Sequence, residues 1–386
     1  MANIAFVAPK PKSLLGYHRQ LAPSAAVKVG PLCLGTMGFG TQFEEMMGSC
    51  DRESSFKLLD LFYENGGNFI DTANVYQNGE SEKILGEWMN ERGNREEIVL
   101  ATKYTSAWQL ANPTVKIQSN FGGNNRKSMR AAFEASLQRL NTSYVDLFYV
   151  HTWDFTTSIS ELMHGLHDLV TSGKVSYLGI SNTPAWVVSM ANEYARQKGL
   201  TVFSVYQGQW SAAERDIERE VLPMCNDQGM AFIPYGVLGS GSFRTSAQRA
   251  AERQTGEKRE GRNVAMTDKP VKTTMADALE KVAIAKNTSI TSVALAWART
   301  KGPYIFPVVG ARKTEHLQAT IDALGLELTR NDIEDIEKAV PFDFGYPQTI
   351  LGGEGGATHP GDVWLTRRFG VFDWVDAPQP PKQHPN

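Results

Sequence analysis

Four side chains that can transfer a proton stand at or just beyond the ends of short apolar runs. Asp71 ends the run "NFI", and Tyr76 follows five residues later. Lys103 ends the run "IVLAT", and His151 ends the run "DLFYV". Each alone has a structural explanation, since an Asp there can cap a turn and a His can be satisfied in a core. Because α/β proteins hold their chemistry at the carboxyl ends of strands, the four together predict an active site.

The chemistry open to these four groups is proton transfer to or from an oxygen atom. A phenol has a pKa near ~10, so Tyr76 alone is a poor acid at neutral pH. A nearby ammonium group stabilises the phenolate, and Lys103 is placed to supply it. Asp71 can keep that lysine charged, and His151 can orient a carbonyl or share the proton. No side chain donates a hydride, so a reduction would need a bound cofactor.

Later strand ends carry groups that suit a nicotinamide cofactor. Ser181, Asn182 and Gln207 are neutral hydrogen-bonding side chains of the kind that hold a carboxamide. Tyr235 could stack on a flat ring. The backbone N–H groups of "LGSG", residues 238–241, could approach a pyrophosphate because glycine permits close contact.

A basic pair follows the last apolar run. The stretch "VGARKTEHL" places Arg312 and Lys313 where a helix begins, which is the usual phosphate site of a barrel. An arginine there favours a 2′-phosphate, so the pair indicates NADP(H) rather than NAD(H). The alternative interpretation is a basic surface turn.

The spacing of apolar residues predicts the elements that position these groups. Eight short runs rich in Val, Ile, Phe and Tyr alternate with longer amphipathic stretches. The runs are "VGPLCLG", "NFIDTA", "IVLATKY", "VDLFYVH", "VSYLGIS", "FSVYQG", "MAFIPYG" and "YIFPVVG". This count predicts an α/β fold, a single (β/α)8 TIM-barrel domain over residues 1–386. The rival, a doubly wound sheet, needs a Gly-rich turn after its first strand, but "GTMGFG" has the wrong spacing.

Helix start signals lie in three of the amphipathic stretches. The stretches from Ser158 to Glu161 and from Thr329 to Asp332 match the capping box, in which two side chains bond each other's backbone N–H. Pro184 is expected at the first position of a further helix, with Asn182 or Thr183 as its N-cap.

Two segments interrupt the alternation of strands and helices. The stretch from Gly239 to Thr273 is polar and follows the seventh run. We expect an extended polar loop there, either a solvated surface excursion or a mobile lid over an anionic ligand. Residues 341–386 form a tail rich in aromatic residues, Gly and Pro. We expect this tail to wrap the barrel or to line the substrate pocket.

Composition and charge narrow the class of protein. The chain has 386 residues, an ordinary globular composition and a formal net charge of -3. Nothing in that balance favours a nucleic-acid or membrane-surface partner. The three cysteines are far apart, so we expect no disulfide framework, no metal site and a reducing compartment. With no signal peptide and no apolar run of ~18 residues, the expected location is cytoplasmic.

A set of motifs, in order along nearly the whole chain, resembles the aldo-keto reductase superfamily. The motifs are "GTM", "FIDTANVYQNGESEKILGEWM", "IVLATKY", "DLFYVH", "GISN", "VYQGQW", "PYGVLGSG" and "VVGARKTEHL". Within the superfamily, "LLGYHRQLAP", "NFGGNN", "TPAWVVSMAN" and "VPFDFGYP" make the chain similar to the fungal group of aryl-alcohol dehydrogenases and norsolorinic acid reductases. The resemblance implies a (β/α)8 barrel and NADPH-dependent carbonyl reduction.

The resemblance also implies a role for each matching residue. Tyr76 is the implied general acid, tuned by Lys103 and Asp71, and His151 orients the substrate carbonyl. The implied cofactor contacts are Thr36 and Asp71 at the nicotinamide ribose, Ser181, Asn182 and Gln207 at the carboxamide, Tyr235 on the nicotinamide ring, Leu238, Gly239 and Ser240 at the pyrophosphate, and Arg312 at the 2′-phosphate with Lys313 and His316 nearby. Where many members have Asn late in the last cofactor helix, this chain has Thr320, so no adenine contact carries over there.

We therefore expect an oxidoreductase of fungal secondary metabolism that reduces an aromatic aldehyde or ketone, or oxidises the aryl alcohol. Four aromatic residues in predicted mouth loops suit a flat substrate: Trp108, Phe121, Trp153 and Trp210. Two other functions of the scaffold stay open: an NADPH-binding regulatory subunit of a channel, without turnover, and a cofactor-assisted isomerase or dehydratase. A Schiff-base enzyme using Lys103 would leave Tyr76, Gln207 and Arg312 unexplained. The substrate, the reaction direction and the oligomeric state are left open.

Overall fold

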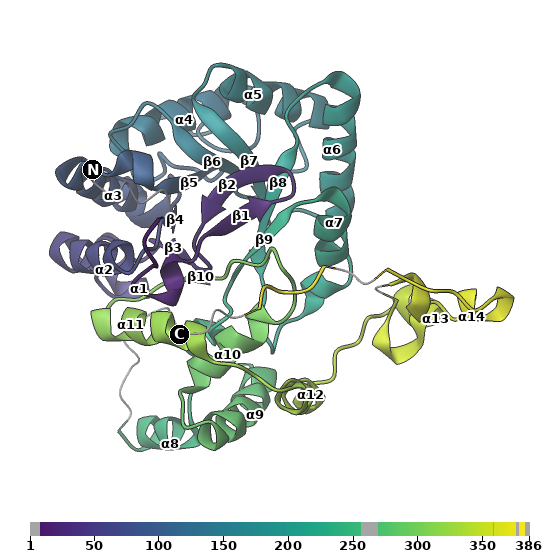
Figure 1. Ribbon diagram of the computed structural model, residues 1–386. Helices are drawn as coiled ribbons and strands as arrows, with labels where there is room; N and C mark the ends of the chain where they lie inside the picture. Colours follow the sequence, from purple (N-terminus) through teal and green to yellow (C-terminus); the bar gives the residue numbers. More distant parts are fainter. Residues whose placement is uncertain (1–7, 256–268, 358, 376–377, 383–386) are drawn as a thin grey trace, which may run out of the picture.

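A computed structural model describes residues 8–255, 269–357, 359–375 and 378–382 of the chain. Its centre is an eight-stranded parallel sheet in the order β10-β3-β4-β5-β6-β7-β8-β9 (Figure 1). The strands are β3 (Cys33–Gly35), β4 (Phe69–Asp71), β5 (Val99–Tyr104), β6 (Val145–Val150), β7 (Val175–Ser181), β8 (Phe203–Gln209), β9 (Ala231–Tyr235) and β10 (Val308–Val309). Each strand begins within one of the eight predicted runs, in the predicted order.

The two edges of this sheet meet each other. β10 pairs with β3, and the residues just before β10 pair with β9. The N–H of Phe232 donates to the carbonyl of Tyr304 (2.9 Å), and the N–H of Phe306 donates to the carbonyl of Phe232 (3.0 Å). The sheet therefore closes into a barrel, and the predicted (β/α)8 TIM-barrel fold is confirmed. A doubly wound sheet would have left both edges open.

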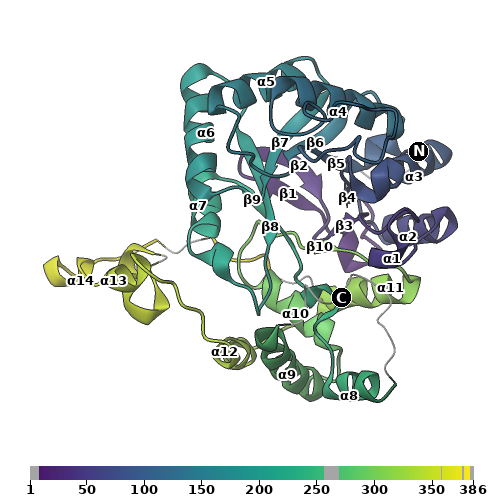
Figure 2. The same cartoon turned by 180° about the vertical axis from the view of Figure 1, so that it is seen from behind.

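Helices surround the barrel (Figures 1 and 2). The longer ones are α2 (Arg52–Glu64), α3 (Glu80–Arg92), α4 (Arg126–Arg139), α5 (Ile159–Thr171), α6 (Ala185–Lys198), α7 (Val221–Gln228), α9 (Pro270–Ala285), α10 (Ile290–Arg299), α11 (Thr314–Asp322) and α12 (Arg330–Ala339). Their apolar faces pack on the outer face of the strands, in a continuous buried cluster that includes Leu59, Phe133 and Phe148. Side chains that point inward from the strands fill the barrel interior as a second buried cluster.

A β-hairpin closes the amino-terminal end of the barrel. Its strands, β1 (Arg19–Ala22) and β2 (Ala25–Val29), pair antiparallel, and β2 leads directly into the start of β3. Leu21 and Val29 are fully buried in the same cluster as the inward-pointing strand residues. This hairpin was not among the elements predicted from the sequence. With the amino end closed, the carboxyl ends of the strands form the mouth at which the predicted site residues stand.

The three predicted helix starts differ in their outcome. α12 begins with the full capping box, in which Thr329 and Asp332 accept from each other's backbone N–H, so that prediction is confirmed. Ser158 caps α5 by accepting from the N–H of Glu161 (3.1 Å), but the Glu161 carboxylate accepts instead from the first N–H of α4 (3.1 Å). Pro184, with an extended ψ of 140°, is the N-cap of α6 rather than its first residue. The predicted N-cap one or two residues earlier is therefore wrong.

The polar segment after β9 is only partly a loop. Residues 246–255 form a helix, α8 (Ser246–Thr255), which packs beside α9 (Figure 1). The N–H of Ser246 donates to the carboxylate of Glu280 (2.8 Å), and Arg249 forms an ion pair with Asp277. The prediction of an extended loop is therefore wrong for these ten residues. Residues 256–268 of the expected lid lie outside the described part of the chain.

The carboxyl-terminal tail leaves the barrel after α12. It carries two short helices, α13 (Gln348–Gly352) and α14 (Thr366–Phe369), to one side of the molecule (Figures 1 and 2). Near its start, Phe342 lies against the guanidinium groups of Arg215 (5.0 Å from the ring centre) and Arg219 (4.6 Å). Packing on the barrel is thus observed at the beginning of the tail. That the tail lines the substrate pocket stays a prediction.

No described helix is both long and apolar enough to cross a membrane. No cluster of three or more His, Cys, Asp or Glu side chains in the same described ranges could hold a metal ion.

The hairpin should contribute to stability because it seals the barrel interior. Leu21→Ala removes a fully buried side chain and should lower the free energy of unfolding by about 2–5 kcal/mol. Urea denaturation followed by circular dichroism measures this change. Ile284→Ala is the control, because that side chain is 74% exposed and its loss should change stability by no more than about 0.5 kcal/mol. Equal effects of the two changes would mean that the hairpin does not seal the barrel.

Candidate active site

Lys103 is the centre of a buried polar network at the mouth of the barrel. Its side chain is fully buried at the end of β5, and its ammonium group pairs with the carboxylate of Asp71. The same nitrogen donates to the carbonyl of Thr72 (2.8 Å) and to the hydroxyl of Tyr76 (3.3 Å). Burial by itself lowers the pKa of Lys103, but the charge of Asp71 and the proximity of Tyr76 outweigh burial and raise that pKa. The lysine is therefore charged at neutral pH.

The carboxylate of Asp71 is held from both sides of the barrel. Asp71 is the last residue of β4, between β3 and β5 in the sheet. One of its oxygens pairs with Lys103, and the other accepts from the side-chain amide of Gln207 on β8 (3.1 Å). The hydroxyl of Thr36 donates to the Asp71 carbonyl (3.2 Å). The two side-chain contacts fix the carboxylate against the lysine, and the bond from Thr36 fixes the backbone that carries it.

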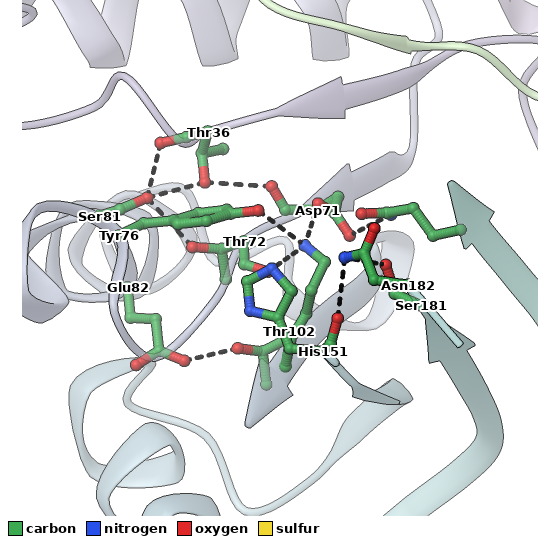
Figure 3. A network of polar contacts seen from close by, with 12 residues as sticks. Thr36, Asp71, Thr72, Tyr76, Ser81, Glu82, Thr102, His151, Ser181 and Asn182 are labelled. Carbon is green, nitrogen blue, oxygen red and sulfur yellow. Dashed lines mark hydrogen bonds and ion pairs between the residues drawn. The ribbon is translucent and has the colours of Figure 1, made fainter. Parts of the chain in front are cut away.

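An unusual turn after β4 brings Tyr76 to this ion pair. Residues 77–79 all have left-handed backbones, with φ of 50°, 53° and 88°. The turn leads into α3 and leaves the ring of Tyr76 near Lys103, whose nitrogen lies 4.9 Å from the ring centre. The rings of Tyr76 and His151 cross almost at right angles, with their centres 5.9 Å apart (Figure 3).

His151 faces this network as a neutral imidazole. Burial and the charge of Lys103 lower the pKa of His151 from 6.5 to about 3. Its Nδ1 atom is buried and has no hydrogen-bond partner among the described residues. A neutral imidazole can hydrogen-bond the oxygen of a ligand. The structure thus brings Asp71, Tyr76, Lys103 and His151 together, while their catalytic roles stay predictions.

The three residues predicted to hold a carboxamide differ in their hydrogen-bond partners. Asn182 donates from its side-chain amide to the hydroxyl of Ser181 (3.1 Å) and to the carbonyl of His151 (2.9 Å). The hydroxyl of Tyr235 donates to the side-chain oxygen of Asn182 (2.9 Å). The ends of β7 and β9 are thereby linked at the mouth. Gln207 differs, because its amide nitrogen donates to Asp71, so it also stabilises the ion pair.

Two segments suited to binding phosphates follow the ends of β9 and β10. Three of its predicted residues, Leu238, Gly239 and Ser240, form the turn at η5 (Gly239–Gly241), and three others, Arg312, Lys313 and His316, lie at the start of α11. The turn is left-handed at Gly239 and Ser240, with φ of 76° and 52°. The backbone N–H groups of such a turn and of a helix start, together with the basic side chains, form a donor set that fits the phosphates of a dinucleotide.

Two residues to which the sequence analysis assigned no role join the strands beneath the mouth. The hydroxyl of Ser81 donates to the carbonyl of Thr36 (2.7 Å) and contacts the hydroxyl of Thr72 (3.0 Å). The buried carboxylate of Glu82 accepts from the hydroxyl of Thr102 (2.6 Å; Figure 3) and from an arginine of α4 (2.7 Å). Both residues lie in the motif "GESE". That motif lies within one that carries the family resemblance, but only the fold shows that the first turn of α3 joins β3, β4 and β5.

Two mouth loops are locked to each other by a pair of residues that the sequence analysis also missed. Asn124 is fully buried in the connection from β5 to α4. Its side-chain oxygen accepts from the N–H of Asp154 (2.8 Å), and the Asp154 carboxylate accepts from the N–H of Asn124 (2.7 Å). The loops that follow β5 and β6 therefore hold a fixed position beside His151.

The four aromatic residues expected at the mouth are not equivalent. Trp108 and Phe121 meet edge to face in the loop after β5, with ring centres 5.6 Å apart. Trp153 lies in the loop after β6 and is 8% exposed. Trp210 is fully buried, with its ring centre 4.8 Å from that of Trp297. Trp210 therefore packs in the core, and the expectation that it contacts a substrate is wrong.

Comparison with known proteins agrees with this architecture. The model of the Aldo/keto reductase family matches residues 31–341. The chain is 51% identical to norsolorinic acid reductase B of Dothistroma septosporum, over 94% of this chain and 93% of that protein. It is 50% identical to an aryl-alcohol dehydrogenase of Pestalotiopsis microspora (96% and 95%). It is 47% identical to aryl-alcohol dehydrogenase [NADP(+)] of Phanerodontia chrysosporium (91% and 92%).

The neutral state of His151 should make stability depend on pH. The folded protein binds fewer protons than the unfolded chain between pH 6.5 and about pH 3, because the His151 pKa is lowered in the fold. The free energy of unfolding should therefore fall as the pH is lowered from 6.5, by about 2 kcal/mol at pH 5 from this group. His151→Gln should remove that part of the fall, as measured by urea denaturation at the two pH values. The exposed His316, changed to Gln, is the control and should keep it. A fall of the same size in wild type and His151→Gln would rule out a buried neutral imidazole.

Proposed function

Because the chain belongs to the aldo/keto reductase family, we propose that this oxidoreductase reduces an aromatic aldehyde or ketone with NADPH and that Tyr76 donates the proton. The reverse reaction, oxidation of an aryl alcohol, uses the same groups. The observation that carries the proposal is the contact between the Tyr76 hydroxyl and the buried ammonium of Lys103 (3.3 Å).

This contact gives Tyr76 the properties of a general acid. As a carbonyl oxygen gains negative charge, the phenol gives up its proton, and the phenolate that remains is stabilised by the ammonium of Lys103. The lysine can do this because its partner Asp71 keeps it charged inside the barrel. NADPH supplies the hydride when it is bound.

His151 orients the carbonyl in this proposal. Its imidazole ring lies beside Tyr76, so both side chains can hydrogen-bond one carbonyl oxygen. Because burial keeps the imidazole neutral, it adds no second positive charge next to Lys103. Tyr76 therefore moves the proton, and His151 fixes the direction from which the carbonyl approaches.

The donor set at the mouth supports NADPH as the cofactor. Ser181 and Asn182, with Gln207, would hold the carboxamide, and Tyr235 would stack on the nicotinamide ring. Thr36 and Asp71 would meet the ribose, and the η5 turn at Leu238, Gly239 and Ser240 would meet the pyrophosphate. Arg312 would pair with the 2′-phosphate, with Lys313 and His316 nearby. A relative at 47% identity carries NADP(+) in its name.

The substrate class rests on the relatives and on the mouth loops. The names of relatives at about 50% identity refer to an aryl alcohol or to norsolorinic acid. Trp108 and Phe121 pack edge to face in the loop after β5. A flat aromatic carbonyl suits such a wall, and we place the reaction in fungal secondary metabolism.

Tyr76→Phe should abolish reduction and leave cofactor binding intact. The change removes only the hydroxyl, so kcat should fall by about 10²–10⁴-fold, while the Kd for NADPH stays within about twofold. The measurement is the loss of NADPH absorbance with a panel of substituted benzaldehydes and aryl ketones. Phe121→Leu is the control, since it alters the mouth but not the proton donor. Near-normal turnover by Tyr76→Phe would refute the assigned role. A wild-type protein that binds NADPH but turns over no member of the panel would instead indicate a regulatory subunit.

Arg312→Ala should separate the two nicotinamide cofactors. If Arg312 pairs with the 2′-phosphate, the Kd for NADPH should rise about 10–100-fold, and the Kd for NADH should not change. Titration of intrinsic fluorescence gives both constants. Arg330, an exposed arginine of α12, provides the matched control Arg330→Ala. A parallel rise in both constants would show that Arg312 does not read the 2′-phosphate.

A further inference from the structure

A closed loop lies between β3 and α2, and it contains the short helix α1 (Glu44–Met47). Its ends are joined, because the N–H of Gly40 donates to the carbonyl of Cys50 (2.8 Å) and the N–H of Cys50 donates to the carbonyl of Gly40 (3.2 Å). Residues 40–50 are called the 40–50 loop below. A loop with paired ends moves as a unit, so its position depends on what holds it from outside.

The turn that carries Tyr76 holds the 40–50 loop. The side-chain oxygen of Gln77 accepts from the N–H of Phe43 (2.8 Å), and its amide donates to the carbonyl of Met37 (3.3 Å). The carboxylate of Glu80 accepts from the N–H of Thr41 (2.8 Å). Gln77 is fully buried and directly follows Tyr76. The loop is therefore fastened to the residue next to the proposed proton donor.

The far side of the 40–50 loop touches Arg312. Gly48 has a φ of +73°, and a Cβ atom built on it would overlap Nη1 of Arg312 and lie 3.1 Å from its Cζ. The guanidinium group thus occupies the space that any side chain at position 48 would take. Burial raises the pKa of the Cys50 thiol at the end of the loop, and the charge of Arg312 acts on that pKa in the opposite direction. Both observations place the guanidinium group against the loop.

We propose that Gly48 is a cofactor-specificity residue, because its missing side chain lets the 40–50 loop seat Arg312 where it pairs with the 2′-phosphate. The inference rests on the proposed function, in which Arg312 binds that phosphate. Gly48 acts through Arg312, and Gln77 acts as a positioning residue that holds the loop on the turn of Tyr76. A guanidinium held in one place loses less conformational freedom on binding, so the loop should favour NADPH over NADH.

A competing explanation is that position 48 needs glycine only for its backbone. A φ of +73° strains any residue with a Cβ, wherever it occurs. Gly353 separates the two explanations, because its φ of 72° and ψ of -158° lie close to the 73° and 165° of Gly48, and no atom lies within 4 Å of a Cβ built on it. Gly48→Ala and Gly353→Ala therefore impose a similar backbone strain, but only the first displaces Arg312.

The test compares these two variants of the full-length protein. Gly48→Ala should raise the Kd for NADPH about tenfold and leave the Kd for NADH unchanged, as measured by fluorescence titration. Gly353→Ala should change neither constant. Gly48→Ala in the Arg312→Ala background should have no further effect on NADPH, because the two changes act through the same group. If Gly48→Ala does not fold, Gln77→Leu, which loosens the loop from outside, should likewise weaken NADPH more than NADH.

The outcomes distinguish this inference from the proposed function. If Arg312→Ala discriminates between the two cofactors but Gly48→Ala weakens both equally or neither, the role of Gly48 is wrong and the proposed function stands. Additive effects in the double variant would also overturn the inference. If Arg312→Ala itself does not discriminate, the assignment of the 2′-phosphate fails, and the inference fails with it.

Discussion

The buried ion pair of Lys103 and Asp71 is the interaction on which the site depends. A charge taken out of water without a partner costs several kcal/mol or more, so neither residue could be buried alone. The pair is completed by the carbonyl of Thr72 and the amide of Gln207, so its hydrogen-bonding groups are satisfied from different strands. The ammonium also reaches the hydroxyl of Tyr76. A charge that would destabilise a core is thereby directed at the proposed proton donor.

The barrel makes this ion pair possible by its register and by its closure. In the parallel sheet, Asp71 is paired with Ala101, which lies two residues before Lys103 along β5. The side chains of Asp71 and Lys103 therefore meet at the mouth end of β4 and β5. The hairpin of β1 and β2 fills the other end with apolar side chains, among them Leu21. Polar groups are therefore concentrated at one mouth, where the loops can add donors for a phosphate, an amide and a carbonyl.

The connections after the strands are not independent of one another. Gln77 holds the 40–50 loop, and that loop touches Arg312 more than two hundred residues away in the chain. Asn124 and Asp154 join the loops after β5 and β6 in the same manner. In two of these links the side chain is fully buried, that of Gln77 and that of Asn124, and it replaces the water a free loop would bind. Such links give a mouth of irregular loops the fixed geometry that the proposed proton transfer and cofactor discrimination require.

The amino-acid sequence alone determined the order of the eight strands, because runs buried on both faces need continuous Val, Ile and Phe. It also indicated Asp71, Lys103 and His151. Each of them alone has a structural explanation, but ionisable side chains at the ends of three successive runs meet at one mouth of a barrel. The tertiary structure alone decided the hairpin, whose strands are short and partly polar, and the burial of Trp210 against Trp297. It alone revealed Ser81, Glu82 and Gly48. These three residues contact residues on other strands and loops. A local sequence pattern does not show which distant residues will lie next to each other in the fold.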